Sequence, residues 1–169
     1  MRLFFALWPP REAAQVLAQW ASEVARISGG RATPEDKIHL TLAFLGGVDP
    51  QKAVTAAKPV RSARFDFPVE TAKYWRDNHI VWVGPREMPE GLQALVERLQ
   101  LALYRAEFIL ERRPFAAHVT LVRKARAPKA LPPLPKLDWP VREFALVNSD
   151  QGRYKDVERF ALDPVGGEH

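Results

Sequence analysis

Two tetrads with the same pattern, histidine, an apolar residue, threonine and leucine, hold the side chains of this sequence that could do chemistry. They run from His39 to Leu42 and from His118 to Leu121. Because side chains alternate across a strand, each histidine shares a face with its threonine. The apolar side chains lie on the other face, where they can pack beneath a helix. Two such strands side by side would line one cleft with two imidazoles and two hydroxyls.

This set of side chains suits the hydrolysis of a cyclic phosphodiester without a metal ion. One neutral imidazole can remove a proton from the attacking water, and the other, as imidazolium, can protonate the departing ribose oxygen. Histidine fits both tasks because its pKa lies near neutral pH. The hydroxyls of Thr41 and Thr120 can donate hydrogen bonds to the non-bridging phosphate oxygens, where charge builds up in the transition state.

Other kinds of site have less support in the sequence. A histidine and a threonine on an amphipathic strand can simply form a solvated sheet face, and this interpretation stays open. A metal site needs more ligands than His39 and His118, and the chain has no cysteine and no well-placed carboxylate beside them. Motifs typical of ATP binding, serine hydrolases and dinucleotide binding are absent, so we expect neither a metal nor a cofactor.

Periodicity predicts the elements that must hold the tetrads in place. Apolar residues at spacings of three and four predict helices over 11–27 and 91–108, and a weaker helix over about 49–62 with Asp49 as N-cap. The five prolines between residues 127 and 140 predict an extended loop. Short apolar or alternating runs predict the following strands: 3–8, 38–45, 65–75, 79–83, 118–123, 141–148 and 157–162.

These elements repeat along the chain. A strand, a proline turn, a helix, a polar loop and a histidine strand follow one another over roughly 2–45 and again over 79–123. Such a repeat indicates related lobes about a pseudo-twofold axis, with the two histidine strands face to face. We therefore expect an α+β fold, with two pseudo-symmetric lobes of antiparallel sheet and outer helices around a central cleft. Residues 1–169 are expected to form one domain in which the lobes interleave.

The composition is that of a globular chain with a basic surface. Apolar residues make up 47% of the chain and charged residues 27%, which is ordinary for a protein with a hydrophobic core. A net charge of +5 suits a phosphate polyanion as partner, although many proteins that bind no nucleic acid share it. The lack of cysteine suits the cytoplasm, and no apolar run is long enough to predict a membrane span.

The sequence resembles the 2H phosphoesterases, and among them the bacterial and archaeal RNA 2′,3′-cyclic phosphodiesterases, historically called 2′-5′ RNA ligases. The resemblance covers most of the chain and is carried by these segments: Arg2–Leu7, His39–Gly46, Val81–Gly84, Arg113–Arg123, the proline loop ending in Trp139, and Tyr154. It implies hydrolysis of a 2′,3′-cyclic phosphodiester at an RNA or nucleotide end to a 2′-phosphomonoester. It also implies a weak reverse 2′-5′ RNA ligation. No membrane and no obligatory protein partner is expected.

The same resemblance implies a role for each residue of the site. His39 would protonate the leaving 3′ oxygen, and His118 would activate water. Thr41 and Thr120 match hydroxyls that contact the phosphate. Arg123 matches a phosphate-binding arginine of the family, yet strict alternation places it on the face opposite His118. Either the strand ends or bulges before Arg123, or this arginine has a structural role.

Residues near the tetrads each have a functional and a structural interpretation. Phe115 could stack on a nucleobase or pack in the core, and Tyr154 could reach the cleft, although a surface loop position is the better prediction. His79 is predicted to be a turn or edge residue, and His169 is terminal. Basic residues around the second tetrad could steer RNA or form a solvated loop: Arg112, Arg113, Arg123, Lys124 and Arg126.

Two alternatives to hydrolysis at RNA ends use the same side chains. One is a cyclic phosphodiesterase that acts on a small nucleotide metabolite. The other is a non-catalytic module in which the histidines bind the phosphate at an RNA end. Turnover of nucleotide and oligonucleotide substrates separates these alternatives.

Overall fold

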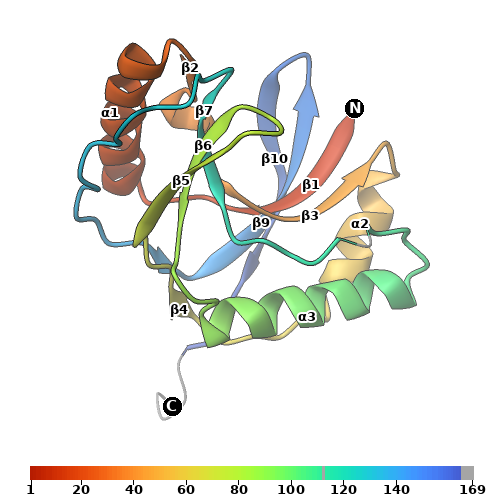
Figure 1. The fold of residues 1–169 in the computed structure, drawn as a ribbon. Helices are drawn as coiled ribbons and strands as arrows, with labels where there is room; N and C mark the ends of the chain where they lie inside the picture. The colour runs from red at the N-terminus through yellow and green to blue at the C-terminus, as the bar shows by residue number, and fades with distance from the viewer. Residues whose placement is uncertain (112, 165–169) are drawn as a thin grey trace.

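Two four-stranded antiparallel sheets form the centre of the fold (Figure 1), and the computed structural model describes residues 1–111 and 113–164. The first sheet has the order β10-β9-β1-β3 and contains β1 (Arg2–Leu7), β3 (Leu40–Gly46), β9 (Glu143–Asp150) and β10 (Arg153–Ala161). The second sheet has the order β2-β7-β6-β5 and contains β2 (Arg31–Ala32), β5 (Thr71–Trp75), β6 (Ile80–Gly84) and β7 (Val119–Arg123). The predicted α+β fold with antiparallel sheets is therefore confirmed.

The remaining elements are helices and a small ribbon. They are α1 (Arg11–Ser28), the 3₁₀ helix η1 (Glu35–Lys37), α2 (Pro50–Ala57), α3 (Glu90–Arg105), and the pair β4 (Phe65–Asp66) and β8 (Pro140–Val141). Both long helices bury most of the apolar stripe that their periodicity predicts, with Leu17 and Val24 of α1 and Leu95 and Leu99 of α3 fully buried. The exception is Tyr104, which is 74% exposed in the last turn of α3, and this helix ends at Arg105 and not at residue 108 as predicted. No helix in the described part of the chain is long and apolar enough to cross a membrane.

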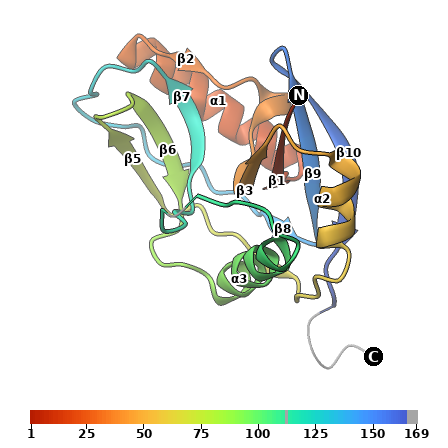
Figure 2. The same cartoon turned by 90° about the vertical axis from the view of Figure 1, so that its right-hand side faces the viewer.

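Each long helix lies against the sheet that the other repeat builds. Helix α1 follows β1 of the first sheet, yet it contacts β2 and β7 of the second. Helix α3 follows β6 of the second sheet, yet it contacts β3 of the first sheet and α2 (Figure 2). This exchange ties the two sheets together, and it keeps β3 and β7, which carry the tetrads, beside one another.

Several boundaries differ from the predictions for physical reasons. The strand predicted over 65–75 is two strands, β4 and β5, because they pair with different partners and Pro68 between them has no N–H to donate. The helix predicted to reach residue 62 ends at Ala57, since Pro59 cannot continue it. The predicted N-cap is confirmed, because the Asp49 carboxylate accepts a hydrogen bond from the backbone N–H of Gln51 at 3.0 Å.

Candidate active site

The two tetrads line one cleft between β3 and β7. The cleft has a volume of about 680 Å³, and its walls include His39, Thr41, His118, Thr120 and Arg123. Each histidine stands directly before its strand, since β3 begins one residue after the first and β7 one residue after the second. The structure therefore brings together all five residues that the sequence singled out.

Both imidazoles are held by the same backbone contact. The Nδ1 atom of His39 lies 2.7 Å from the carbonyl oxygen of Lys37, and Nδ1 of His118 lies 2.8 Å from that of Ala116. A carbonyl can only accept a hydrogen bond, so Nδ1 carries the proton in each ring. In the neutral form, Nε2 is then the nitrogen with a free lone pair. Nε2 of His39 lies 3.0 Å from the hydroxyl oxygen of Thr41, which can donate to it.

A β-bulge follows the threonine in both tetrads and explains where Arg123 lies. In β7, Thr120 pairs with Trp82 and Val122 with Val81, which leaves Leu121 as an extra residue. Leu121 and Val122 are consequently both buried, and the next side chain returns to the face of the histidine. Strict alternation is thus wrong beyond the tetrad. Of the alternatives open for Arg123, the bulge is the one observed, and it places Arg123 in the cleft.

The first tetrad has the equivalent bulge. In β3, Thr41 pairs with Ala6 and Ala43 with Phe5, so Leu42 is the extra residue. Phe44 therefore occupies the position that corresponds to Arg123, five residues after the histidine. Phe44 lines the cleft, is 48% exposed and stacks on Phe4 with ring centroids 5.7 Å apart. The backbone symmetry thus presents an arginine on one side of the cleft and an aromatic ring on the other.

Aromatic rings surround each histidine. The sequence does not predict that most of these rings lie there. The ring centroid of His39 lies 5.0 Å from that of Phe4, 5.7 Å from Trp8 and 5.5 Å from Tyr154. Tyr154 lies in β10 and lines the cleft, so its prediction as a surface loop residue is wrong. On the other side, the His118 ring lies 4.7 Å from Trp75. The repeat could have indicated Phe44, but the rings of other strands depend on sheet order, which no local pattern encodes.

The electrostatic environment disfavours the charged form of both histidines. Burial lowers the pKa of His39, and the Arg123 guanidinium and the His118 ring lower it further, while the hydrogen bond to Lys37 opposes the shift. Burial also lowers the pKa of His118, with Arg123 acting in the same direction and the hydrogen bond to Ala116 against it. Without substrate, both imidazoles are therefore biased toward the neutral form.

The remaining candidates divide between the cleft and the surface. Arg113 and Phe115 line the cleft, and Phe115 also packs against the hydrophobic core. His79 lies in the turn before β6, with φ of +56°, and its ring hydrogen-bonds to the hydroxyl of Tyr74, in agreement with the prediction of a turn or edge residue. Lys124 and Arg126 are exposed and do not line the cleft. Arg112 and His169 lie outside the described residues.

Within residues 1–111 and 113–164, no three histidine, cysteine, aspartate or glutamate side chains lie close enough together to hold a metal ion.

Known proteins are similar to this chain in sequence and in fold. A family model described as "LigT like Phosphoesterase" matches residues 7–82. The RNA 2′,3′-cyclic phosphodiesterase of Escherichia coli (strain K12) is 35% identical over 95% of this chain and 96% of its own length. The RNA 2′,3′-cyclic phosphodiesterase of Thermus thermophilus is 34% identical over 100% of this chain and 92% of its own length. The crystal structure of E. coli LigT complexed with 3′-AMP has a TM-score of 0.83 and 33% identity, and covers 95% of this chain and 97% of its own. The chain belongs to the LigT-like phosphoesterases, a family of 2H phosphoesterases.

Proposed function

We propose that this protein hydrolyses a 2′,3′-cyclic phosphodiester at the end of an RNA or nucleotide to a 2′-phosphomonoester, with residues 1–169 acting as one domain. The observation that carries the proposal is the pair of imidazoles in one cleft, each with Nδ1 bound to a backbone carbonyl. Two of the relatives named above are RNA 2′,3′-cyclic phosphodiesterases. Structures of E. coli LigT complexed with 3′-AMP and with phosphate add support.

In the proposed mechanism, the two histidines exchange protons with the substrate through Nε2. His118 accepts a proton from water as the water oxygen bonds to phosphorus. The bond between phosphorus and the 3′ oxygen breaks, and His39 in its imidazolium form donates its Nε2 proton to that oxygen. One proton enters and one leaves, so a second transfer through solvent restores the starting state. The resemblance to the family supports this assignment of donor and acceptor. A weak 2′-5′ ligation uses the same step with a 5′-hydroxyl in place of water: its oxygen bonds to phosphorus, its proton passes to His118, and the 3′ oxygen leaves with the proton from His39.

The other polar side chains of the cleft serve the phosphate. In the transition state, negative charge builds on the two non-bridging oxygens, and Thr41 and Thr120 can each donate a hydrogen bond there. Arg123 offers a planar, permanently charged donor set that fits phosphate oxygens. The bulge matters to this mechanism because it turns Arg123 toward the cleft.

Binding of the substrate would favour the protonated form of His39, the proposed acid. The lowered pKa of His118 suits a base, whereas His39 has to be protonated before it can donate. A bound phosphodiester carries a negative charge that offsets the effect of Arg123, so it favours imidazolium formation on His39. The substrate itself thereby contributes to the active pairing of one acid with one base.

We also propose the cytoplasm as the compartment and RNA or a nucleotide as the binding partner. The cytoplasm is the expected compartment, because the chain has no cysteine that would require an oxidising environment. A net charge of +5 supports RNA or a nucleotide as the binding partner. No protein partner and no cofactor is needed for the proton transfers described above.

The experiment that tests this function is turnover in the presence of EDTA. A 2′,3′-cyclic mononucleotide and an oligonucleotide with a cyclic-phosphate end are incubated with the protein, and ³¹P NMR identifies the product. The proposal expects a 2′-phosphomonoester from both substrates. A 3′-phosphomonoester would overturn the assigned bond cleavage, and loss of activity with EDTA would overturn the metal-free mechanism. Turnover of the mononucleotide alone favours a small metabolite, and tight binding without product favours a binding module.

A further inference from the structure

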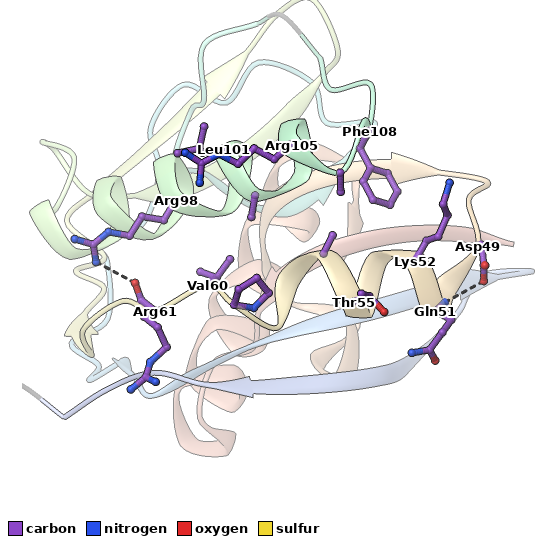
Figure 3. A pocket seen from close by; sticks show the side chains of 14 residues that line it. Asp49, Gln51, Lys52, Thr55, Val60, Arg61, Arg98, Leu101, Arg105 and Phe108 are labelled. Carbon is purple, nitrogen blue, oxygen red and sulfur yellow. Dashed lines mark hydrogen bonds between the residues drawn. The ribbon is translucent and has the colours of Figure 1, made fainter.

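A second hollow lies between α2 and α3, apart from the catalytic cleft (Figure 3). This α2–α3 groove has a volume of about 770 Å³. Its lining is largely apolar, with the side chains of Ala56, Val60, Leu101, Ala102 and Phe108. The cationic side chains that line it are Lys52, Arg61, Arg98 and Arg105, against one carboxylate, that of Asp49 at the start of α2. An apolar surface bordered by positive charge suits a ligand that is itself both apolar and anionic.

Most of the positive charge in the groove is not neutralised. Arg61 pairs with Asp163 at 2.6 Å. Arg98 instead donates to the backbone carbonyl of Arg61 at 3.1 Å, so its charge has no carboxylate partner in the described part of the chain. The same holds for Lys52 and Arg105, which are both exposed. An anionic ligand can therefore bind to Lys52, Arg98 and Arg105 without breaking an existing ion pair.

Exposed ring and aliphatic surface accompanies these charges. On α3, Leu101 lines the groove and is 49% exposed; Tyr104 is 74% exposed next to Arg105 in the sequence but does not line the groove. Phe108 follows the helix and lines the same groove, and Figure 3 shows it at the end where Lys52 lies. Proteins bind single-stranded RNA with this combination of side chains, because bases stack on rings while cations follow the phosphates.

The groove is also adjacent to the catalytic cleft. Gln100 of α3 lines the cleft, whereas Leu101, the next residue, lines the groove. After the helix, Phe108 lines the groove and Leu110 lines the cleft. The catalytic cleft and the α2–α3 groove are therefore separated only by helix α3 and the segment that follows it. A polynucleotide whose 3′ end lies in the cleft would have to cross only this segment to reach the groove.

We propose that the α2–α3 groove binds the upstream part of the same single-stranded RNA whose cyclic-phosphate end is hydrolysed in the cleft. The proposal rests on the function proposed above. It makes RNA ends better substrates than free nucleotides, because a mononucleotide reaches only the cleft. Contacts in the groove add to substrate binding, whereas the chemistry in the cleft stays the same for every length of substrate.

The test compares substrate lengths in a charge-neutralised groove variant. The variant is Lys52→Gln with Arg105→Gln, and the control is Arg11→Gln with Arg26→Gln, two exposed arginines of α1 with the same loss of charge. kcat/KM is measured for a 2′,3′-cyclic mononucleotide and for cyclic-phosphate oligonucleotides of up to about ten nucleotides. The salt dependence of oligonucleotide binding is measured in parallel, with 2′-phosphate oligonucleotides as the probe.

The expected result is specific to long substrates. In the wild type, kcat/KM rises with length, and the groove variant loses about tenfold on the oligonucleotides and nothing on the mononucleotide, while the control matches the wild type. The slope of log K against log salt falls by about 0.7 for each phosphate contact removed. A third variant, Phe108→Ala, removes the ring that lines the groove and is expected to weaken oligonucleotide binding by about fivefold or more, with mononucleotide turnover as the check that the variant is folded.

Three outcomes overturn the proposal and leave the proposed function intact. The first is a kcat/KM that is independent of length, and the second is a groove variant that behaves like the α1 control. The third is a wild-type dimer that the groove variant dissociates without change in oligonucleotide turnover, since the groove would then bind a second copy of this chain. Failure of the wild type to hydrolyse any cyclic phosphate would instead refute the function itself.

Discussion

Replacing Arg123 by glutamine tests the consequence of the β-bulge. Because the bulge turns this side chain into the cleft, the variant loses a charged donor to the phosphate. A hydrogen bond to a charged group is worth about 1.5–3 kcal/mol. If that energy is realised in the transition state, kcat/KM falls about 10- to 150-fold, since 1.36 kcal/mol corresponds to a factor of ten.

The same substitution also changes the pH dependence. Arg123 lowers the pKa of both His39 and His118, so its removal favours the protonated form of each ring. Both limbs of the bell-shaped profile of kcat/KM should consequently move to higher pH. The assay is hydrolysis of a 2′,3′-cyclic nucleotide from about pH 5 to pH 9, with Arg123→Lys as the variant that keeps the charge but not the planar donor set.

The control for this experiment is Arg126→Gln, which removes an exposed arginine three residues further along the chain and outside the cleft. This variant should reproduce the rate and the pH profile of the wild type. If Arg123→Gln gives the same rate and profile as Arg126→Gln, Arg123 does not act on the phosphate or the histidines, and the inference from the bulge is refuted.

Three further predictions concern the cleft and its support. Thr41→Val and Thr120→Val should each lower kcat roughly 10- to 100-fold, and an unchanged kcat would remove the hydroxyls from the mechanism. Gly84→Ala should destabilise the protein by about 1–3 kcal/mol in urea denaturation, because a Cβ there would lie 2.5 Å from the carbonyl oxygen of Ala117; wild-type stability would contradict this packing. Both cleft histidines have a pKa below 6.5 when folded, so the unfolded chain binds more protons near that pH, and the free energy of unfolding should fall as pH is lowered through about 6.5. Substitution of both histidines by glutamine should flatten this dependence, and an unchanged slope would contradict the pKa shifts.

Sequence reasoning could predict the site because its main features are local. The pairing of each histidine with a threonine follows from strand alternation, and the repeat of strand, helix and strand predicts two such pairs. The structure places both pairs in one cleft, as expected. The antiparallel sheets and the two long helices could be predicted for the same reason, since their apolar periodicity is a local property of the chain.

What could not be predicted depends on pairing between distant segments. The bulge at Leu121 depends on the register shift between β6 and β7. Tyr154 reaches the cleft because β10 begins at Arg153, earlier than the apolar residues of this strand indicate. Likewise, the exchange of α1 and α3 between the two sheets leaves no mark on the periodicity of either helix. Each of these features is set by tertiary contacts. Only the bulge could be anticipated, because the sequence predicts that the strand must end or bulge before Arg123 if this side chain is to face the cleft.

The central claim, that His39 and His118 act together in one chemical step, is tested most directly by a double-substitution cycle on cyclic-nucleotide hydrolysis. Each single change to alanine should lower kcat/KM by about two orders of magnitude or more. The double variant should lose much less than the product of the two factors, because a site that has lost one partner gains little from the other. His79→Ala, outside the cleft, should match the wild type. A single cleft variant within about threefold of the wild type, or fully multiplicative losses, would contradict the account.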